Sequence, residues 1–276
     1  GKTTVIVNRI ANMINFGNAY MDETLSGSEG DIAFLNDYAE GKTDDFETLR
    51  DIAAVSPVKP WNILAITFTN KAAGELRERL AAMLGEDGMN INASTFHSAC
   101  VRILRSEIEA MGYGRDFTIY DSDDSQRLIK NIMADIDISE KQIAPRAILS
   151  EISFAKDKMI TPAEMHKDAG QDYRKKIISR IYSLYQERMK EANALDFDDL
   201  LCRTVELFEQ FPEILEKYQK RYKYIMVDEY QDTNHVQFRL VSLLSSGHGN
   251  LCVVGDDDQS IYKFRGANIE NILGFE

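Results

Sequence analysis

The first stretch of the chain has apolar residues every three or four positions, the spacing of a helix with one buried face. Residues 4–16 follow this rhythm, and Gly17 comes directly afterwards. Glycine commonly ends a helix because it adopts backbone conformations that other residues avoid. We therefore predict a helix over residues 4–16 that ends near Gly17.

Short, continuous apolar runs mark the predicted strands, at residues 63–68, 224–227 and 251–254. Such runs are typical of parallel strands that are buried on both faces. The first run leads into residues 70–84, which are rich in Ala, Glu, Arg and Leu, so a helix is predicted to follow this strand. Residues 95–110 predict another helix.

The middle of the chain has a different pattern. Residues 107–203 show amphipathic helical spacing with little sign of strands. We therefore predict an α/β domain with a parallel sheet, formed by residues 1–106 and 204–276, and an inserted all-helical domain over residues 107–203.

Charge adds one unusual segment to this picture. The net charge of −13 opposes binding to a polyanion such as DNA. However, residues 17–57 hold ten acidic and two basic side chains, which leaves a charge of −5 for all other residues, so DNA is not excluded. The segment also contains apolar side chains, unlike a fully disordered tract. It is either a solvated surface insertion or an acidic element that binds a protein partner or regulates the chain.

No apolar run approaches the roughly 20 residues needed to span a bilayer, and the first residues lack the features of a signal peptide. We therefore expect no membrane role and a cytoplasmic location. Three widely spaced cysteines, Cys100, Cys202 and Cys252, lie among apolar residues. This favours buried thiols in a reducing compartment over disulfides or a zinc site.

The chain starts with Gly1, Lys2, Thr3 and Thr4, directly before the first predicted helix. These residues match the end of the phosphate-binding pattern G-x-x-x-x-G-K-[ST]. In that pattern the lysine reaches the terminal phosphates, the hydroxyl binds magnesium, and the helix N-terminus points free N–H groups at the anion. Taken alone the short match is weak, because many loops that start a helix have similar residues.

A second element with matching chemistry is the apolar strand at residues 225–227, which ends in Asp228 and Glu229. In a Walker B element the aspartate holds the metal and the glutamate polarises the attacking water as a general base. A pair of acids in solvent at a strand end is the alternative. The third predicted strand leads to Gln259, a candidate sensor of the terminal phosphate, although a polar turn would have similar residues.

Four longer segments closely resemble successive motifs of the UvrD/PcrA/Rep family of superfamily 1 helicases. They are residues 65–73 (AITFTNKAA), 94–98 (STFHS), 228–234 (DEYQDTN) and 255–267 (GDDDQSIYKFRGA). The similarity covers almost the whole chain, includes residues 195–200 (LDFDDL), and departs mainly at residues 17–57.

This resemblance implies a RecA-like P-loop NTPase fold, the use of ATP and magnesium, and 3'-to-5' movement on single-stranded DNA and at single/double-strand junctions. The family has two RecA-like domains, each with an insertion, and this chain resembles the first pair. A second motor domain would follow Glu276 and supply catalytic arginines, so residues 1–276 alone would not unwind DNA. The alternatives are the motor of a helicase-nuclease complex and a nucleotide- and DNA-binding module without turnover.

The resemblance also assigns residues to two adjoining sites. Besides the residues at the start of the chain, the ATP side would contain Asp228, Glu229 and Gln259, and the DNA side would contain Phe68, Asn70, Thr95, Phe96, His97, Tyr262, Phe264 and Arg265. Aromatic rings stack on bases of any sequence, while Asn, Thr and Arg donate to phosphates. Core packing explains Phe68, Phe96 and Tyr262 equally well. Phe264 lies between two basic residues, which favours a DNA contact.

Two further groups of polar residues are not predicted to bind metal. His97 has no second ligand beside it at a suitable spacing. Asp196, Asp198 and Asp199 lack the glycine-centred loop of a calcium site. We expect these three aspartates to have a structural or helix-capping role.

Overall fold

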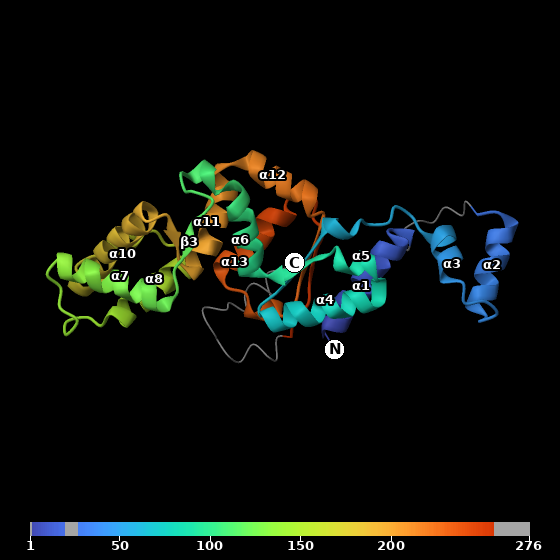
Figure 1. The fold of residues 1–276 in the computed structure, drawn as a ribbon, viewed down its shortest axis with the longest axis horizontal. Coiled ribbons are helices and arrows are strands. Elements are labelled where there is room, and N and C mark those ends of the chain that lie inside the picture. Colours follow the sequence, from blue (N-terminus) through green and yellow to red (C-terminus); the bar gives the residue numbers. More distant parts are fainter. Residues whose placement is uncertain (1, 20–26, 257–276) are drawn as a thin grey trace.

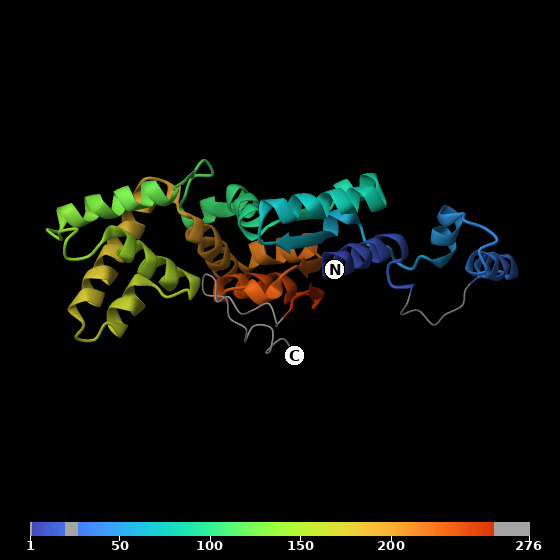
Figure 2. The ribbon, with the colours of Figure 1, turned by 90° about the horizontal axis from the view of Figure 1, so that it is seen from below.

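The computed structural model describes residues 2–19 and 27–256, which form an elongated molecule (Figure 1). A parallel sheet with its helices lies in the middle. Four helices of residues 122–191 form one end, and two helices of the acidic segment form the other, as both views show (Figures 1 and 2). The predicted α/β fold with a parallel sheet is confirmed.

Four parallel strands form this sheet in the order β2–β1–β5–β6. Their bounds are Asn92–Thr95 for β2, Ile63–Thr67 for β1, Tyr224–Val227 for β5 and Leu251–Val253 for β6. The three strands predicted from apolar runs are therefore present. The sequence NAST of β2 contains no apolar run, so this strand was not predicted, and it is defined by its pairing with β1.

Alternate residues of the strands face opposite layers of helices, as the two-residue repeat of a strand requires. The helices are α1 (Lys2–Phe16), α4 (Asn70–Leu84), α6 (Phe96–Glu107), α11 (Phe197–Gln210) and α13 (His235–Ser245). Leu64 and Ile66 share a hydrophobic core with α6, α11 and α13. Ile63 and Ala65 share another with α1 and α4. Burial on both faces explains why β1, β5 and β6 have apolar residues at successive positions.

Helix α1 ends where predicted, at Gly17. The φ of Gly17 is 60°, and a β-carbon there would lie 2.1 Å from the carbonyl oxygen of Val55, so only glycine fits. The chain returns to this point after the acidic segment. The N–H of Asn18 donates to the Val55 carbonyl oxygen at 2.7 Å, and the N–H of Val55 donates to the Phe16 carbonyl oxygen at 3.0 Å. We call these two hydrogen bonds the neck.

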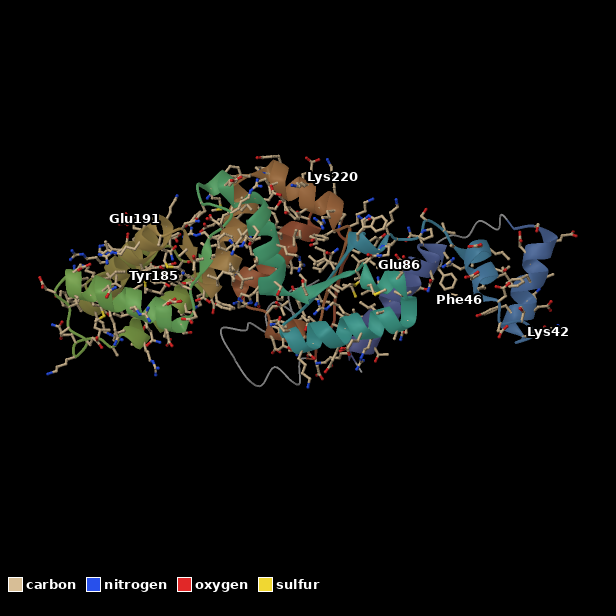
Figure 3. All side chains as sticks on the ribbon, viewed as in Figure 1. Lys42, Phe46, Glu86, Tyr185, Glu191 and Lys220 are labelled. Atoms are coloured by element: carbon tan, nitrogen blue, oxygen red, sulfur yellow. The ribbon has the colours of Figure 1, made fainter. Side chains whose placement is uncertain are left out.

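The acidic segment contains two exposed helices, α2 (Glu29–Ala39) and α3 (Phe46–Ala53). We call residues 27–56 the acidic hairpin. Ser28 caps α2 and Asp45 caps α3, so side-chain oxygens start both helices. Neither helix has a buried residue. Phe46, labelled in Figure 3, lies edge-on to Phe16 with 5.8 Å between ring centres. The hairpin is exposed, as expected for a surface insertion. Binding of the hairpin to a protein partner stays a prediction.

The opposite end of the molecule has a core of its own. Its helices are α7 (Ser122–Asp135), α8 (Pro145–Asp157), α9 (Pro162–Asp168) and α10 (Tyr173–Glu191). Tyr185, labelled in Figure 3, is buried in this core with Ile148 and Ile181. The amphipathic spacing of residues 107–203 is therefore explained by helices that pack on one another.

This region is not all-helical, contrary to the prediction. Strands β3 (Thr118–Ile119) and β4 (Ala194–Leu195) pair in parallel where the chain enters and leaves the four helices. Strands of two residues leave no periodic pattern in a sequence. The predicted boundary at residues 203–204 also falls inside α11, whose buried side chains share a core with the sheet. A boundary at β3 and β4 fits this packing better, and the division into two domains stays a prediction.

Two of the three clustered aspartates have the structural role that was expected. Asp196 is the N-cap of α11 and accepts a hydrogen bond from the N–H of Asp199 at 2.8 Å. Lys156 of α8 lies 2.6 Å from the Asp196 carboxylate and 2.9 Å from that of Asp199. All three side chains are buried. A buried charge network thus joins α8, at the helical end, to α11, beneath the sheet.

Short elements complete the described chain: η2 (Pro60–Asn62), α5 (Glu86–Met89), η3 (Ile108–Met111), α12 (Pro212–Arg221) and η4 (Tyr230–Asp232). Helix α6 and η3 together account for the helix predicted over residues 95–110. None of the helices in the described ranges is both long and apolar enough to cross a bilayer. Cys100 and Cys202 are buried thiols, as predicted, whereas Cys252 is partly exposed.

Candidate nucleotide and DNA site

The N-terminus of α1 lies against the end of β5, at the carboxyl edge of the sheet. The Thr3 hydroxyl donates a hydrogen bond to Asp228 Oδ2 at 3.0 Å. The Lys2 ammonium lies 2.5 Å from Glu229 Oε2. These partners are 225 and 227 positions apart in the sequence. The fold therefore brings the two predicted phosphate- and metal-binding motifs together in one place.

Asp228 is held by the sheet. Its N–H donates to the Ile66 carbonyl oxygen at 3.0 Å, which continues the pairing of β5 with β1, and its side chain is buried. A hydroxyl and a carboxylate are the protein groups that hold magnesium in P-loop enzymes, so the contact between Thr3 and Asp228 fits this ion. Across residues 2–19 and 27–256, no three His, Cys, Asp or Glu side chains form a metal-binding group.

Glu229 leaves the strand with a left-handed backbone, at a φ of 51°, which is uncommon for a residue with a side chain. Its carboxylate accepts hydrogen bonds from Lys2 and, at 2.6 Å, from Nε2 of Gln231. Burial would raise the pKa of Glu229, but these hydrogen bonds and the charge of Lys2 outweigh it, so the pKa lies below its ordinary value. The carboxylate is therefore ionised at neutral pH, as a general base must be.

The start of α1 suits a phosphate. Its first turn contains no acidic residue, so the positive end of the helix dipole and the charge of Lys2 act in the same direction. Lys2 and Thr3 are partly buried, and Thr4 is exposed on the same turn. These features match the anion-binding role predicted for the start of the chain.

Residues that follow β1 and β2 form a second cluster at this edge. Phe68 is partly buried, and its ring centre lies 5.4 Å from that of Phe96. Phe96 is only 1% exposed, so it has no ring face open to a base, and core packing is the better explanation of this residue. Thr95 is buried and caps α6 by accepting from the N–H of Ser98. Asn70 is exposed at the start of α4.

His97 lies beside an exposed aromatic ring. Its ring centre is 5.5 Å from that of Phe197, the first residue of α11. Phe197 is 56% exposed, although it is large and apolar. Phe197 therefore has the exposed ring that Phe96 lacks, and the His97 ring packs beside it.

Comparison with known proteins agrees with this geometry. Residues 48–276 match the family described as the UvrD/REP helicase N-terminal domain. The chain belongs to this family. It is similar to the ATP-dependent DNA helicase PcrA of Bacillus subtilis (strain 168), with 45% identity over 272 residues, which are 98% of this chain and 37% of that protein. The PcrA helicase of Staphylococcus aureus (strain Mu50) is 44% identical over 265 residues, or 96% of this chain and 36% of that protein. The chain thus spans little more than a third of the length of these relatives.

Some residues that the helicase resemblance assigns lie outside the described residues. They are Gly1, Gln259, Tyr262, Phe264 and Arg265. Their predicted roles in binding ATP or DNA stay predictions. Lys2, Thr3, Asp228 and Glu229 are the predicted ATP-side residues that the structure brings together.

Two residues of the helicase motifs were missed by the sequence analysis. Phe197 lies between two aspartates at the start of a helix, and an aromatic residue in such a polar setting is a signal that could have been used. Gln231 lies inside the motif at residues 228–234 but is buried, and it hydrogen-bonds to Glu229. No sequence signal separates Gln231 from its neighbours, because its importance depends on a partner beyond the motif.

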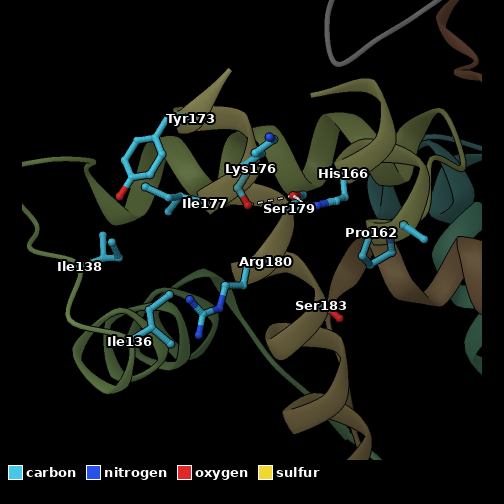
Figure 4. Close-up of a pocket in the computed structure, with 11 residues that line it drawn as sticks. Ile136, Ile138, Pro162, His166, Tyr173, Lys176, Ile177, Ser179, Arg180 and Ser183 are labelled. Atoms are coloured by element: carbon cyan, nitrogen blue, oxygen red, sulfur yellow. Dashed lines mark hydrogen bonds between the residues drawn. The ribbon is translucent and has the colours of Figure 1, made fainter. Parts of the chain in front are cut away.

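The helical end of this UvrD/REP family chain contains a pocket of 670 Å³ (Figure 4). Its polar lining includes Lys176, Arg180 and His166, whose Nδ1 lies 2.9 Å from the Ser179 hydroxyl. None of the predicted helicase site residues lines this pocket. It is therefore separate from the site at the sheet edge.

Proposed function

We propose that this chain is the N-terminal motor portion of an ATP-dependent 3'-to-5' DNA helicase, which binds ATP with magnesium and binds single-stranded DNA. The observation that carries the proposal is the pair of contacts at the sheet edge, from Thr3 to Asp228 and from Lys2 to Glu229. The PcrA relatives are named ATP-dependent DNA helicases, which supports the helicase part of the proposal.

Each residue of the ATP site has a chemical task in this proposal. Lys2 and the first turn of α1 would bind the phosphates, and Thr3 and Asp228 would hold a magnesium ion, which would neutralise charge on the phosphates. Glu229 takes a proton from the attacking water. Because Lys2 is paired with Glu229 in this structure, it must turn away from that carboxylate to reach a phosphate.

DNA is proposed to bind along the same edge, next to the ATP site. Phe68 follows β1, and Phe197 is exposed beside His97, so rings are available for stacking on bases. Asn70 is exposed and can donate to a phosphate. Stacking of this kind does not depend on base identity, which suits a protein that moves along any sequence.

The variant Glu229→Gln tests this function in a full-length protein that contains the chain. We expect DNA-stimulated ATP hydrolysis to fall by roughly 100-fold or more, because the general base is lost, while binding of ATP is retained. Glu206→Gln is the matched control, since Glu206 is also partly buried and ion-paired, with Arg203, but lies on α11. Unchanged turnover in Glu229→Gln would show that the assigned role is wrong, and absence of ATP hydrolysis in the parent protein would favour a module without turnover.

A further inference from the structure

Gln231 is a buried amide that connects two parts of the ATP site. Only 2% of the surface of Gln231 is exposed. Nε2 donates to Glu229 Oε2 at 2.6 Å, and Oε1 accepts from the backbone N–H of Asp256 at 3.0 Å. Asp256 follows β6, whereas Glu229 follows β5. Gln231 therefore joins the segments that leave two neighbouring strands.

The chemistry of its partners fixes how this amide is oriented. The backbone N–H of Asp256 can only donate, so it must face the amide oxygen, and the ionised carboxylate of Glu229 can only accept, so it must face the amide nitrogen. Turning the amide over would leave buried polar groups without partners, which is unfavourable. Glutamate lacks the donor and leucine lacks both groups, so neither can replace Gln231 in this link.

The other partner of Glu229 is needed elsewhere during the reaction. Lys2 donates to the same oxygen, Oε2, at 2.5 Å, but the proposed function requires Lys2 to turn to the phosphates. Within the described part of the chain, the side chains that hydrogen-bond to the Glu229 carboxylate are those of Lys2 and Gln231. When Lys2 turns away, Gln231 is the one of these two that stays.

We propose that Gln231 is a positioning residue for Glu229, an inference that rests on the proposed function. It holds the Glu229 carboxylate in place while Lys2 binds phosphate. Because Gln231 also accepts from the backbone N–H of Asp256, the position of the carboxylate depends on the position of that backbone. Gln259, the candidate phosphate sensor, lies three residues beyond Asp256 in the sequence. Movement of the backbone at Asp256 would therefore displace the general base, and a displacement of about 1 Å can lower a rate roughly 100-fold.

The first test compares two buried glutamines in the full-length protein that contains this chain. Gln237 is buried like Gln231, but its side chain completes the capping box of α13 by accepting a hydrogen bond from the backbone N–H of Asn234, the N-cap. For Gln231→Leu we expect kcat of DNA-stimulated ATP hydrolysis to fall by roughly 10- to 100-fold, with ATP binding changed by less than about threefold, because a misplaced base loses much of its effect. For Gln237→Leu we expect kcat within about twofold of the parent, because its cap affects stability and not the site.

The second test uses a variant that nearly keeps the size and shape of Gln231. Gln231→Glu retains an acceptor for the N–H of Asp256 but has no donor for Glu229, so the link is broken while the packing is preserved. We expect kcat to fall by roughly 10- to 100-fold, as in Gln231→Leu, with ATP binding changed by less than about threefold. A merely structural role would not divide its effect between kcat and ATP binding in this way.

The results separate this inference from the function on which it rests. A normal kcat in either Gln231→Leu or Gln231→Glu would overturn the positioning role. The role would also be overturned if Gln231→Leu and Gln237→Leu lost kcat equally and if each loss of kcat matched the loss of thermal stability, since the effect would then be structural. If Glu229→Gln stays active in the same assay, the proposed function fails. If Glu229→Gln alone loses activity, only the role of Gln231 fails.

Discussion

At the scale of single residues, Lys156 is the most enclosed cation in the described part of the chain, with 2% of its surface exposed. Burial would lower the pKa of Lys156, but the carboxylates of Asp196 and Asp199 outweigh this and hold it well above the ordinary value. The lysine is therefore charged, and it compensates two buried acids. Its role is to join α8 to α11.

Lys156→Met should destabilise the protein by about 3–5 kcal/mol, because two buried carboxylates lose their cation. The loss should shrink as the pH falls, because protonated carboxyl groups tolerate burial. Lys220→Met is the control. Lys220 pairs with Glu216, and both side chains are exposed; such pairs contribute at most about 1 kcal/mol. Chemical denaturation of both variants would measure the difference, and similar losses in the two would contradict the assignment of a buried network.

The exposed ring of Phe197 gives a second prediction for a single residue. In the full-length protein, Phe197→Ala should weaken binding of single-stranded DNA by about 1–3 kcal/mol, the contribution of one stacked base. Trp61→Ala is the control, because Trp61 is 51% exposed but precedes β1 and so lies at the opposite edge of the sheet. Titration of a labelled oligonucleotide would measure both affinities. Equal affinities for the parent and Phe197→Ala would place the DNA elsewhere.

The residues of the site differ in how far sequence could identify them. Lys2, Thr3, Asp228 and Glu229 belong to motifs whose chemistry is carried by the residue types themselves. The structure brings these four side chains together, and their roles stay predictions. The burial of Phe96 could not be predicted, because an aromatic residue after a strand fits a core and a stacking surface equally well. Gln231 depends on the backbone of the β6 segment, and no pattern around position 231 reveals that contact.

At the scale of elements, the acidic hairpin is attached to the rest of the protein by a small number of contacts. The two hydrogen bonds of the neck join Asn18, Val55 and Phe16, and the rings of Phe16 and Phe46 meet beside them. The chain thus leaves α1 and returns to almost the same point. The hairpin could be removed without pulling the ends of the remaining chain apart.

Replacing residues 19–54 with two glycines should therefore preserve folding and ATP hydrolysis. We expect a loss of about 1 kcal/mol, because the aromatic pair of Phe16 and Phe46 is removed, partly offset by the shorter loop. Phe46→Ala should reproduce this loss, and thermal unfolding would measure both. Failure of the shortened protein to fold would show that the hairpin is part of the core. Loss of a protein partner with normal hydrolysis would support the second interpretation of the acidic segment.

Elements with an apolar run or a helical pattern were predicted well, and strands without such a pattern were not. The strands β1, β5 and β6 have apolar runs because helices cover both faces of the sheet, and α4 has residues that favour helices. By contrast, β2 has the sequence NAST with no apolar run, and β3 and β4 have two residues each, too few to show a pattern. They exist because neighbouring strands pair with them, and this information is not local in the sequence.

At the scale of the whole molecule, charge is distributed unevenly along the long axis. The acidic hairpin has eight acidic and two basic residues, a net charge of −6. The helical end, residues 122–191, has twelve acidic and thirteen basic residues, a net charge of +1. Figure 1 shows the sheet and its helices between these two ends.

This arrangement gives the molecule an electric dipole moment along its length. In the field of a polyanion such as DNA, the hairpin is repelled and the molecule turns so that its helical end leads. The effect acts only at short range, since salt screens charges beyond about 8 Å under physiological conditions. Among molecules that approach the polyanion, those that arrive with the hairpin pointing away are favoured. The hairpin can therefore influence the orientation of an encounter complex without making any contact in it.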